Sequence, residues 1–235
     1  MKTNRILAIL VCISVLFGCN KSETGRNGCG GDYNGHYISG FCIATGFRLF
    51  PVNRDPETII LIFAQTEDDI YRTELYEELC EYYGDTSYNG NRPRLPHVTM
   101  CYADEFTSFD VYSSADFGDI KAGESLADIV MFTGATAKPY IDGNYSLENV
   151  DTQVYTKMKE ELGEHYEYID SYRHEGFYPI CKRASELTPE EMILLNANFM
   201  TIRFTEIPDI KEHTLTIVFR TKDKEVREEI DVVFK

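Results

Sequence analysis

The regular alternation in the last part of the chain, residues 214–234, narrows the possible folds more than any other feature. In Thr214–Thr221, Leu215, Ile217 and Phe219 stand at alternate positions, and in Glu225–Phe234 the residues Val226, Ile230, Val232 and Phe234 share one parity. Lys222-Asp223-Lys224 lies between the two segments. Successive side chains of a β-strand point to opposite faces, so this spacing predicts two strands, each with one face on a core. The short polar link predicts a hairpin turn. The expected inward residues are Leu215, Ile217, Phe219, Val226, Ile230, Val232 and Phe234.

Further short segments of this character lie along the chain between turn-forming residues. They are rich in β-branched and aromatic side chains, which suit a pleated, half-buried surface. Many short strands separated by turns are typical of β-sandwiches, so we predict a mainly β fold, an immunoglobulin-like or related β-sandwich. The expected strands outside the hairpin are Phe41–Pro51, Thr58–Gln65, His97–Ala103, Ser108–Ser114, Ala127–Phe132 and Phe199–Thr205.

Three segments predict short helical insertions in this sandwich. Glu67–Tyr83 places apolar residues roughly on one side and acidic residues on the other, and Val150–His165 has apolar residues four positions apart. Residues 188–191 (Thr-Pro-Glu-Glu) have the pattern of a capping box with proline at the first helical position. Residues 36–235 show no strong internal linker, so we expect one β-sandwich domain there.

Residues 1–18 have the pattern of a lipoprotein signal peptide. A short basic segment precedes the apolar run 6–17, which is shorter than the ~20 residues that a transmembrane helix needs. The run ends in Leu16-Phe17-Gly18-Cys19, which resembles the bacterial lipobox, although Phe17 is bulkier than usual. The resemblance implies cleavage before Cys19 and lipidation of that residue. The alternative is an ordinary secretory cleavage beside a chance cysteine.

The residues after Cys19 indicate how the protein is held at a membrane. Several acyl chains on one cysteine anchor a protein durably, so the membrane is an expected partner. By analogy with sorting in Gram-negative bacteria, Asn20 favours the outer membrane, on its periplasmic or its cell-surface face. Residues 19–35 are polar and rich in glycine, which predicts a flexible tether between the anchor and the domain.

The charge of the chain restricts its partners. The formal net charge is −16. Such a surface repels phosphate backbones and anionic lipids, so we exclude nucleic acid as a partner. An acidic surface is compatible with cations or neutral glycans, and it also serves solubility.

Five cysteines remain when Cys12 leaves with the signal peptide and Cys19 takes lipid. An exported protein can form disulfides, and an odd number leaves at least one thiol unpaired within the chain. Cys29 and Cys42, close in sequence, are the first expected pair, and Cys80 with Cys101 is the second. The CxxC-like spacing of structural zinc sites is absent, so we expect no metal site.

Two blocks of sequence carry a family resemblance. Residues 108–132 contain Ala-Gly-Glu-Ser-Leu-Ala-Asp between two expected strands, and residues 187–234 contain Leu-Thr-Pro-Glu-Glu-Met, a strand ending at Pro208 and the closing hairpin. These blocks resemble an uncharacterised family of Bacteroidetes lipoproteins, a domain of unknown function. The shared motifs are structural, so the resemblance implies an exported β-domain and no particular activity.

The motifs of hydrolytic enzymes are incomplete in this chain. The segment Gly123–Ala127 lacks the second glycine of a nucleophile elbow, and His174-Glu175 offers only the first histidine of an HExxH motif. Cys101 and His97 would share a strand face but lie too far apart to touch. Asp142–Glu148 lacks the spacing of a calcium loop. We therefore expect no catalytic residue and no cofactor.

Clustered tyrosines in polar settings are the remaining candidates for binding. Aromatic rings stack on sugars, which makes these tyrosines candidate glycan contacts; alternatively they pack their rings and expose only their hydroxyls. The candidates are Tyr82, Tyr83, Tyr88, Tyr166 and Tyr168. The sequence thus favours a non-enzymatic, lipid-anchored envelope protein that serves as a binding or accessory module for a glycan or an envelope protein. The alternatives are a hydrolase with an unpatterned carboxylate site and a structural subunit of a surface assembly.

Overall fold

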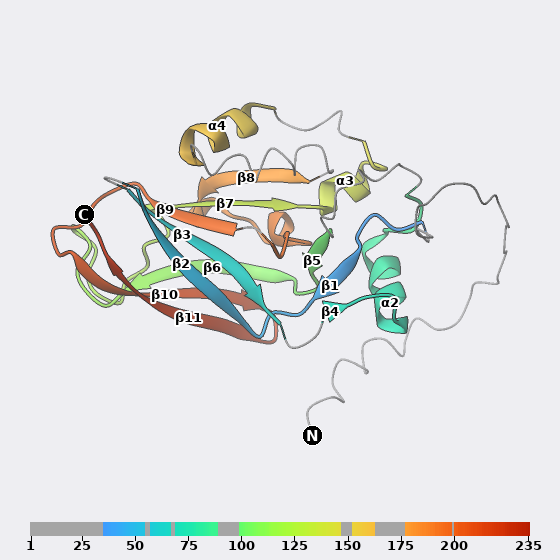
Figure 1. Cartoon of the computed structure of the whole chain (residues 1–235), viewed down its shortest axis with the longest axis horizontal. Helices are drawn as coiled ribbons and strands as arrows, with labels where there is room; N and C mark the ends of the chain where they lie inside the picture. The colour runs from blue at the N-terminus through green and yellow to red at the C-terminus, as the bar shows by residue number, and fades with distance from the viewer. Residues whose placement is uncertain are drawn as a thin grey trace, which may run out of the picture. The chain divides into compact units, whose positions relative to one another are not determined.

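A computed structural model describes residues 35–54, 57–66, 69–88, 99–146, 152–162, 177–198 and 200–235 of the chain. These residues all lie in one unit, Tyr33–Lys235. The unit is mainly β, with three sheets and a few short helices, and it confirms the predicted class of a β-sandwich with helical insertions (Figure 1). The expected signal peptide, Cys19, the tether and Cys29 lie outside the described residues.

The closing hairpin forms one side of a three-stranded sheet with the order β11 (Glu225–Val233), β10 (Glu212–Thr221) and β6 (Phe106–Ser113). All neighbouring strands are antiparallel. The link between β10 and β11 is a turn in which the Thr221 hydroxyl accepts the backbone N–H groups of Asp223 and Lys224. Leu215, Ile217 and Phe219 are buried, as the alternation predicts.

A second sheet of five antiparallel strands has the order β2 (Gly46–Arg54), β3 (Glu57–Gln65), β9 (Met200–Phe204), β7 (Val130–Thr136) and β8 (Tyr178–Arg183). Every residue of β7 is buried. Helices α3 (Lys138–Asp142) and α4 (Thr152–Leu162) contact β8 at the edge of this sheet (Figure 1). No helix among the described residues is long and apolar enough to cross a membrane.

The two sheets share one hydrophobic core, and Phe219 of β10 lies at its centre. The centroid of its ring is 4.7 Å from that of Phe47 on β2, 4.6 Å from that of Phe109 on β6 and 5.0 Å from that of Phe106. Phe109 in turn packs on Phe132 of β7, with ring centroids 5.2 Å apart. Aromatic contacts therefore connect strands of both sheets.

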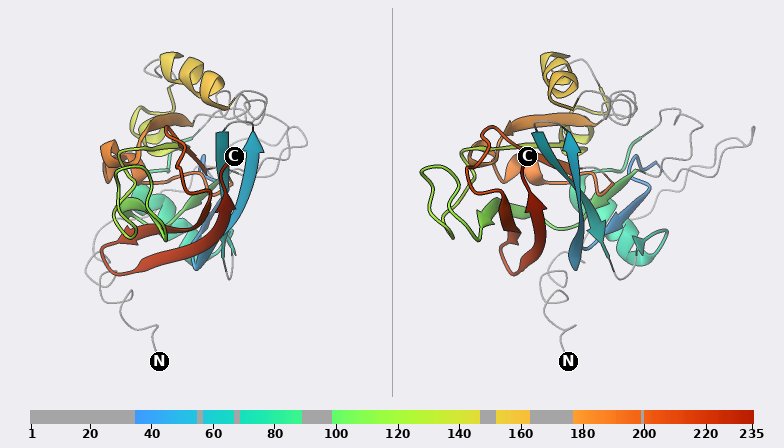
Figure 2. Two further views of the ribbon diagram at one scale, coloured as in Figure 1. Left: turned by 90° about the vertical axis from the view of Figure 1, so that its left-hand side faces the viewer. Right: turned by 60° about the vertical axis from the view of Figure 1, so that its left-hand side comes forward.

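The edges of the two sheets also meet, where β11 lies beside β2 (Figure 2). Glu228 of β11 accepts the backbone N–H of Phe47 at 3.4 Å. Gly46 permits this approach, since a Cβ at that position would lie 2.5 Å from the Glu228 carboxylate. An inward-pointing carboxylate on an edge strand also discourages pairing with another chain.

The hairpin turn is fixed to a distant part of the chain by Lys224. Its Nζ donates to the backbone carbonyl of Ala44 at 2.8 Å and lies 2.6 Å from Asp104 Oδ1. The other oxygen of Asp104 accepts the backbone N–H of Ala44 at 2.7 Å. Both backbone groups of Ala44 are therefore bonded to side chains rather than to a neighbouring strand.

A third, smaller sheet lies beside this point, with the order β4 (Asp69–Ile70), β1 (Gly40–Cys42) and β5 (Met100–Tyr102). Helix α2 (Glu74–Tyr83) follows β4. It begins where the Thr73 hydroxyl accepts the Tyr76 N–H, and it ends at Gly84, whose φ of 80° suits glycine.

Several predicted boundaries were wrong. The expected strand Phe41–Pro51 is two strands, β1 and β2, because the bonds to Ala44 interrupt it. The expected helix Glu67–Tyr83 begins only at Glu74, since Asp69 and Ile70 pair with β1. The capping box at 188–191 starts a single 3-10 turn, Glu190–Met192, in which Glu191 accepts the N–H of Thr188. Strand β8 and helix α3 were not predicted.

We expect Phe219→Ala to lower the free energy of unfolding by about 3–5 kcal/mol, because it removes a fully buried ring from the contact between the sheets. Denaturation with urea, followed by circular dichroism, measures this loss. Phe50→Ala is the matched control, since Phe50 is 49% exposed on β2 and its loss should cost far less. Equal losses in the two variants would contradict the assignment of Phe219 to the core.

Candidate functional site

The second hydrophobic cluster of the protein lies around α2 and the third sheet, and it is rich in tyrosine. The inner face of α2 supplies Tyr76, Cys80 and Tyr83, which are buried. Tyr83 packs on Phe41 of β1 with ring centroids 5.9 Å apart, and Tyr76 packs edge-on against the ring of His36 at 5.6 Å. This cluster also contains the buried polar groups from which a site could be built.

Asp85 is the central polar residue of this cluster, and it is fully buried just after α2. Its Oδ1 accepts the backbone N–H of Tyr37 at 2.7 Å and the hydroxyl of Tyr145 at 3.0 Å, and its Oδ2 accepts the N–H of Ile38 at 2.8 Å. Burial raises the pKa of Asp85 above its ordinary value, and these three hydrogen bonds oppose that rise. Asp85 therefore joins three separate segments of chain.

Tyr145 reaches Asp85 through an unusual backbone conformation. Asn144 and Tyr145 have φ values of 53° and 60°, in the left-handed region that is uncommon for residues other than glycine. Such a conformation costs roughly 1–2 kcal/mol per residue. The contacts of the Tyr145 side chain, including its bond to Asp85, help to maintain it.

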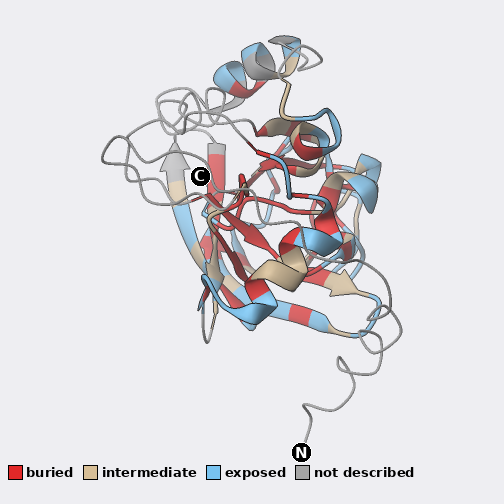
Figure 3. Ribbon diagram, turned by 90° about the vertical axis from the view of Figure 1, so that its right-hand side faces the viewer, coloured by how far each residue is buried: buried red, intermediate tan, exposed pale blue. Residues whose placement is uncertain are grey.

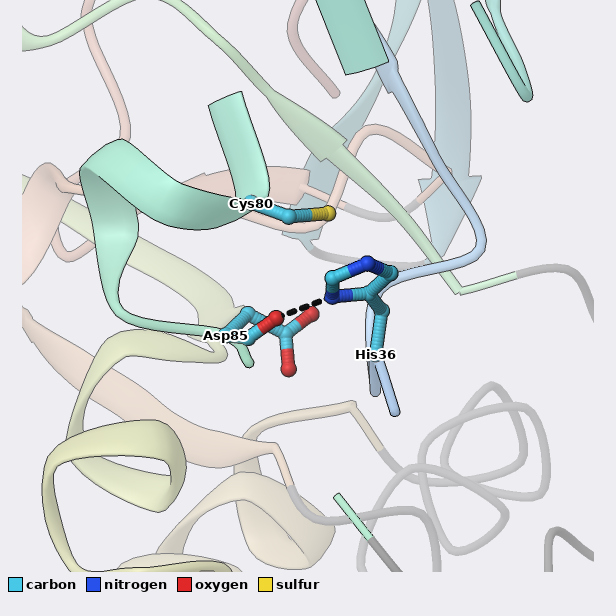
Figure 4. A group of neighbouring side chains, drawn as sticks. All are labelled: His36, Cys80 and Asp85. Carbon is cyan, nitrogen blue, oxygen red and sulfur yellow. Dashed lines mark hydrogen bonds between the residues drawn. The ribbon is translucent and has the colours of Figure 1, made fainter. Parts of the chain in front are cut away.

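His36 and Cys80 lie against Asp85 and complete a buried group (Figure 4). His36 Nδ1 contacts the backbone carbonyl oxygen of Asp85, and Nε2 lies 2.8 Å from Glu77 Oε2. One possible ligand atom from each of His36, Cys80 and Asp85 lies within 4.8 Å of the other two. We refer to these three residues as the His36–Cys80–Asp85 cluster. Cys80 has no exposed surface, so a nucleophilic role toward a substrate has no access route.

The sequence analysis did not find this cluster. Cys80 and Asp85 stand more than forty positions after His36, a separation much longer than the short spacings that indicate a metal site in a sequence. The only local signal is the spacing of Glu77 and Cys80, which places both on one side of a helix.

The thiols of Cys42 and Cys101 are also buried near this cluster. Burial, followed by the negative charges of Asp104 and Asp69, raises the pKa of Cys42 to about 12. Burial raises the pKa of Cys101 as well. Both thiols therefore stay protonated at neutral pH and are poor nucleophiles. Cys101 is a free thiol, so the second expected pair, Cys80 with Cys101, is not formed.

A serine–histidine pair links β6 to β10 at another place. Ser113 Oγ lies 2.6 Å from His213 Nδ1, and His213 Nε2 lies 2.8 Å from the carbonyl oxygen of Ile210. Since that carbonyl only accepts, Nε2 carries a proton and donates it there. The arrangement resembles an activated nucleophile, but both residues are buried beside Phe117 and Phe234. It therefore serves as a link within the fold.

The structure separates the predicted glycan-contact tyrosines. Tyr82 is 63% exposed, and its hydroxyl donates to Glu105 Oε1 at 2.9 Å. Tyr83 and Tyr88 are buried in the second hydrophobic cluster, where their rings complete the packing around Phe41 and Tyr37. The prediction that these two are surface contacts was therefore wrong. Tyr166 and Tyr168 lie outside the described residues.

Two other exposed apolar side chains lie at the start of α2. Leu75, seven positions before Tyr82 and so near its face of the helix, is exposed, as is Tyr71 just before the helix. The hydroxyl of Tyr71 lies 3.5 Å from Asp69 Oδ2, and the hydroxyl of Tyr82 donates to Glu105. We call Tyr71, Leu75, Tyr82 and their two carboxylates the α2 surface. Figure 3 shows exposed and buried residues side by side along this helix.

No protein-family model, curated protein or solved structure matches this chain. The resemblance of residues 108–132 and 187–234 to a family of Bacteroidetes lipoproteins therefore stays a prediction that rests on those residues.

We expect Cys42 to resist alkylation by iodoacetamide in the native protein at mildly alkaline pH, since its raised pKa leaves almost no thiolate. Peptide mapping by mass spectrometry checks this. After unfolding in guanidinium without reductant, Cys42 should become alkylated, because its thiol is free in the structure.

The same experiment tests the predicted disulfide between Cys42 and Cys29. Cys29 lies outside the described residues, so this pairing stays a prediction. Alkylation of Cys42 only after reduction would establish a disulfide and contradict the free thiol.

Proposed function

We propose that this protein is a lipid-anchored envelope protein that acts by contact, and that its α2 surface binds a neutral glycan. The observation that supports this is the exposed ring of Tyr82, whose hydroxyl is held by Glu105 at 2.9 Å. A large aromatic ring left in water and fixed in orientation is a surface suited to a ligand.

The geometry around Tyr82 matches what a sugar requires. One face of a pyranose ring is apolar and stacks on an aromatic ring, while its hydroxyls need acceptors at the edge. The ring of Tyr82 is packed edge-on against the buried ring of Tyr83, with centroids 4.9 Å apart, which limits its motion. The Glu105 carboxylate beside it retains lone pairs for sugar hydroxyls.

The charge around the α2 surface favours a neutral ligand. The helix carries Glu74, Glu77, Glu78 and Glu81, and the chain as a whole has a net charge of −16. These carboxylates repel sulfated, phosphorylated or uronic-acid polymers. Neutral polysaccharides are not penalised in this way.

The polar groups of the described residues support contact rather than catalysis. Both described histidines, His36 and His213, are buried and hydrogen-bonded within the fold. The thiols of Cys42 and Cys101 are kept protonated by burial. Hydrolysis needs a nucleophile or an activated water that a substrate can reach.

The amino-terminal residues supply the location in this proposal. The lipobox-like Leu16–Cys19 would place lipid on Cys19, and Asn20 favours the outer membrane. The polar tether that follows would allow a reach of roughly 20–25 Å from the anchor. The α2 surface could then meet a glycan near the membrane.

We expect the full-length protein, purified in detergent, to be retarded in gels that contain a neutral polysaccharide and to be unaffected by anionic ones. Tyr82→Ala should weaken this binding at least about tenfold, since losing a central aromatic contact costs about 1.4 kcal/mol or more. Phe50→Ala is the control, because it removes another exposed aromatic ring, from β2. Absence of retardation on every neutral polymer, or equal loss in both variants, would refute the proposal.

We expect Cys19→Ala to abolish incorporation of labelled palmitate in a bacterial host and to release the protein from the membrane fraction. The reason is that Cys19 is the only residue of Leu16–Cys19 that can take lipid. Cys12→Ala, within the apolar run, is the control and should leave labelling intact. Persistent label in the Cys19 variant would contradict lipid anchoring.

A further inference from the structure

We propose that the His36–Cys80–Asp85 cluster is a structural Zn²⁺ site, which fastens the chain before β1 to the end of α2. This inference is independent of glycan binding, since it concerns the buried side of α2. It rests on the donor atoms, on the orientation of the imidazole ring and on the charge of the surroundings.

The three donor atoms are close enough to share one ion. They lie no more than 4.8 Å apart. Ligands of a single tetrahedral Zn²⁺ are ~3.3–3.8 Å apart, given bond lengths of about 2.0–2.3 Å. A thiolate, an imidazole nitrogen and a carboxylate oxygen form a donor set that suits zinc better than calcium or magnesium. Small inward movements of these side chains would supply three of the four ligands of a tetrahedral site.

The orientation of His36 places a ring nitrogen toward this point. Glu77 Oε2 lies 2.8 Å from Nε2, so the carboxylate accepts the proton of Nε2. Histidines that bind metals commonly donate their second ring N–H to a carboxylate in this way. The other ring nitrogen, Nδ1, faces Asp85 and contacts its backbone carbonyl oxygen (Figure 4).

The hydrogen bonds of Asp85 leave room for a metal bond. Oδ1 already has two donors, from Tyr37 and Tyr145, but Oδ2 has one, from Ile38. A carboxylate oxygen can accept two partners, so Oδ2 keeps a lone pair. No lysine or arginine among the described residues forms an ion pair with this buried carboxylate. A divalent cation would compensate its charge.

Burial indicates that such an ion is structural. Asp85 and Cys80 have no exposed surface and His36 has only 7%. An ion that no substrate can reach can only stabilise the fold, whereas catalytic zinc sites keep a position open to substrate. The three ligands come from the segment before β1, from α2 and from the residue after its Gly84 cap, and the ion would hold these together.

Titration of the full-length protein, stripped of metal and kept reduced, with Co²⁺ and then Zn²⁺ tests the proposal. We expect one Co²⁺ per chain with thiolate charge-transfer absorption in the near ultraviolet, and displacement of Co²⁺ by Zn²⁺. Cys80→Ser should lose this absorption. Cys181→Ser is the matched control, because Cys181 is a buried cysteine on β8 outside the cluster, and it should retain the absorption.

X-ray absorption at the zinc edge of the wild-type protein tests the proposal even if Cys80→Ser fails to fold. One sulfur scatterer at about 2.3 Å, with nitrogen or oxygen at about 2.0–2.2 Å, supports the site. Failure of the wild-type protein to bind either metal, absence of sulfur from the coordination shell or retention of the charge-transfer band by a folded Cys80→Ser variant would overturn it.

Discussion

The packing of Phe219 between the two larger sheets is the contact on which the rest of the structure depends. Its ring centroid lies 4.7 Å from that of Phe47 on β2 and 4.6 Å from that of Phe109 on β6, so it connects strands of both sheets. Each sheet has an apolar face that would otherwise be exposed to water, and the shared core gives both a place to bury it. Strand β7 belongs to both clusters, because Phe132 packs in the shared core and Ala135 packs in the second cluster.

Polar atoms help to hold the second cluster together. A buried carboxylate is unfavourable unless hydrogen bonds or a cation compensate it. Asp85 meets this requirement with two backbone N–H groups and the Tyr145 hydroxyl, and these bonds fix where Tyr37 and α2 lie. The exposed Tyr82 is on the outer side of the same helix. The proposed binding surface and the proposed metal site are therefore two faces of one element.

The sequence predicted the parts of this fold that follow from local periodicity and missed those that depend on distant contacts. The alternation predicted the buried residues Leu215, Ile217 and Phe219 of β10, although Val218, which it places on the outward face, is buried as well. The break at Ala44 could not be predicted, because the carboxylate that causes it lies 60 residues further along the chain. Strand β8 escaped notice since it contains Pro179, which an edge strand tolerates. The burial of Tyr83 and Tyr88 could not be predicted, because tyrosine occurs both on surfaces and in cores. The His36–Cys80–Asp85 cluster could not be predicted either, because it forms only when separate segments of the chain pack together.

The bond from Lys224 to Ala44 has a consequence for the order in which the protein folds. The two residues are 180 positions apart, and Glu228 and Phe47, which also interact, are 181 apart. Contacts of such high sequence separation slow folding, since a long stretch of chain must be ordered before they form. The amino-terminal strands are therefore without these partners until the last hairpin has been synthesised. Until then the edge of β2 is open to pairing with other chains. The chain must therefore stay unfolded, or have this edge covered, until the hairpin is in place.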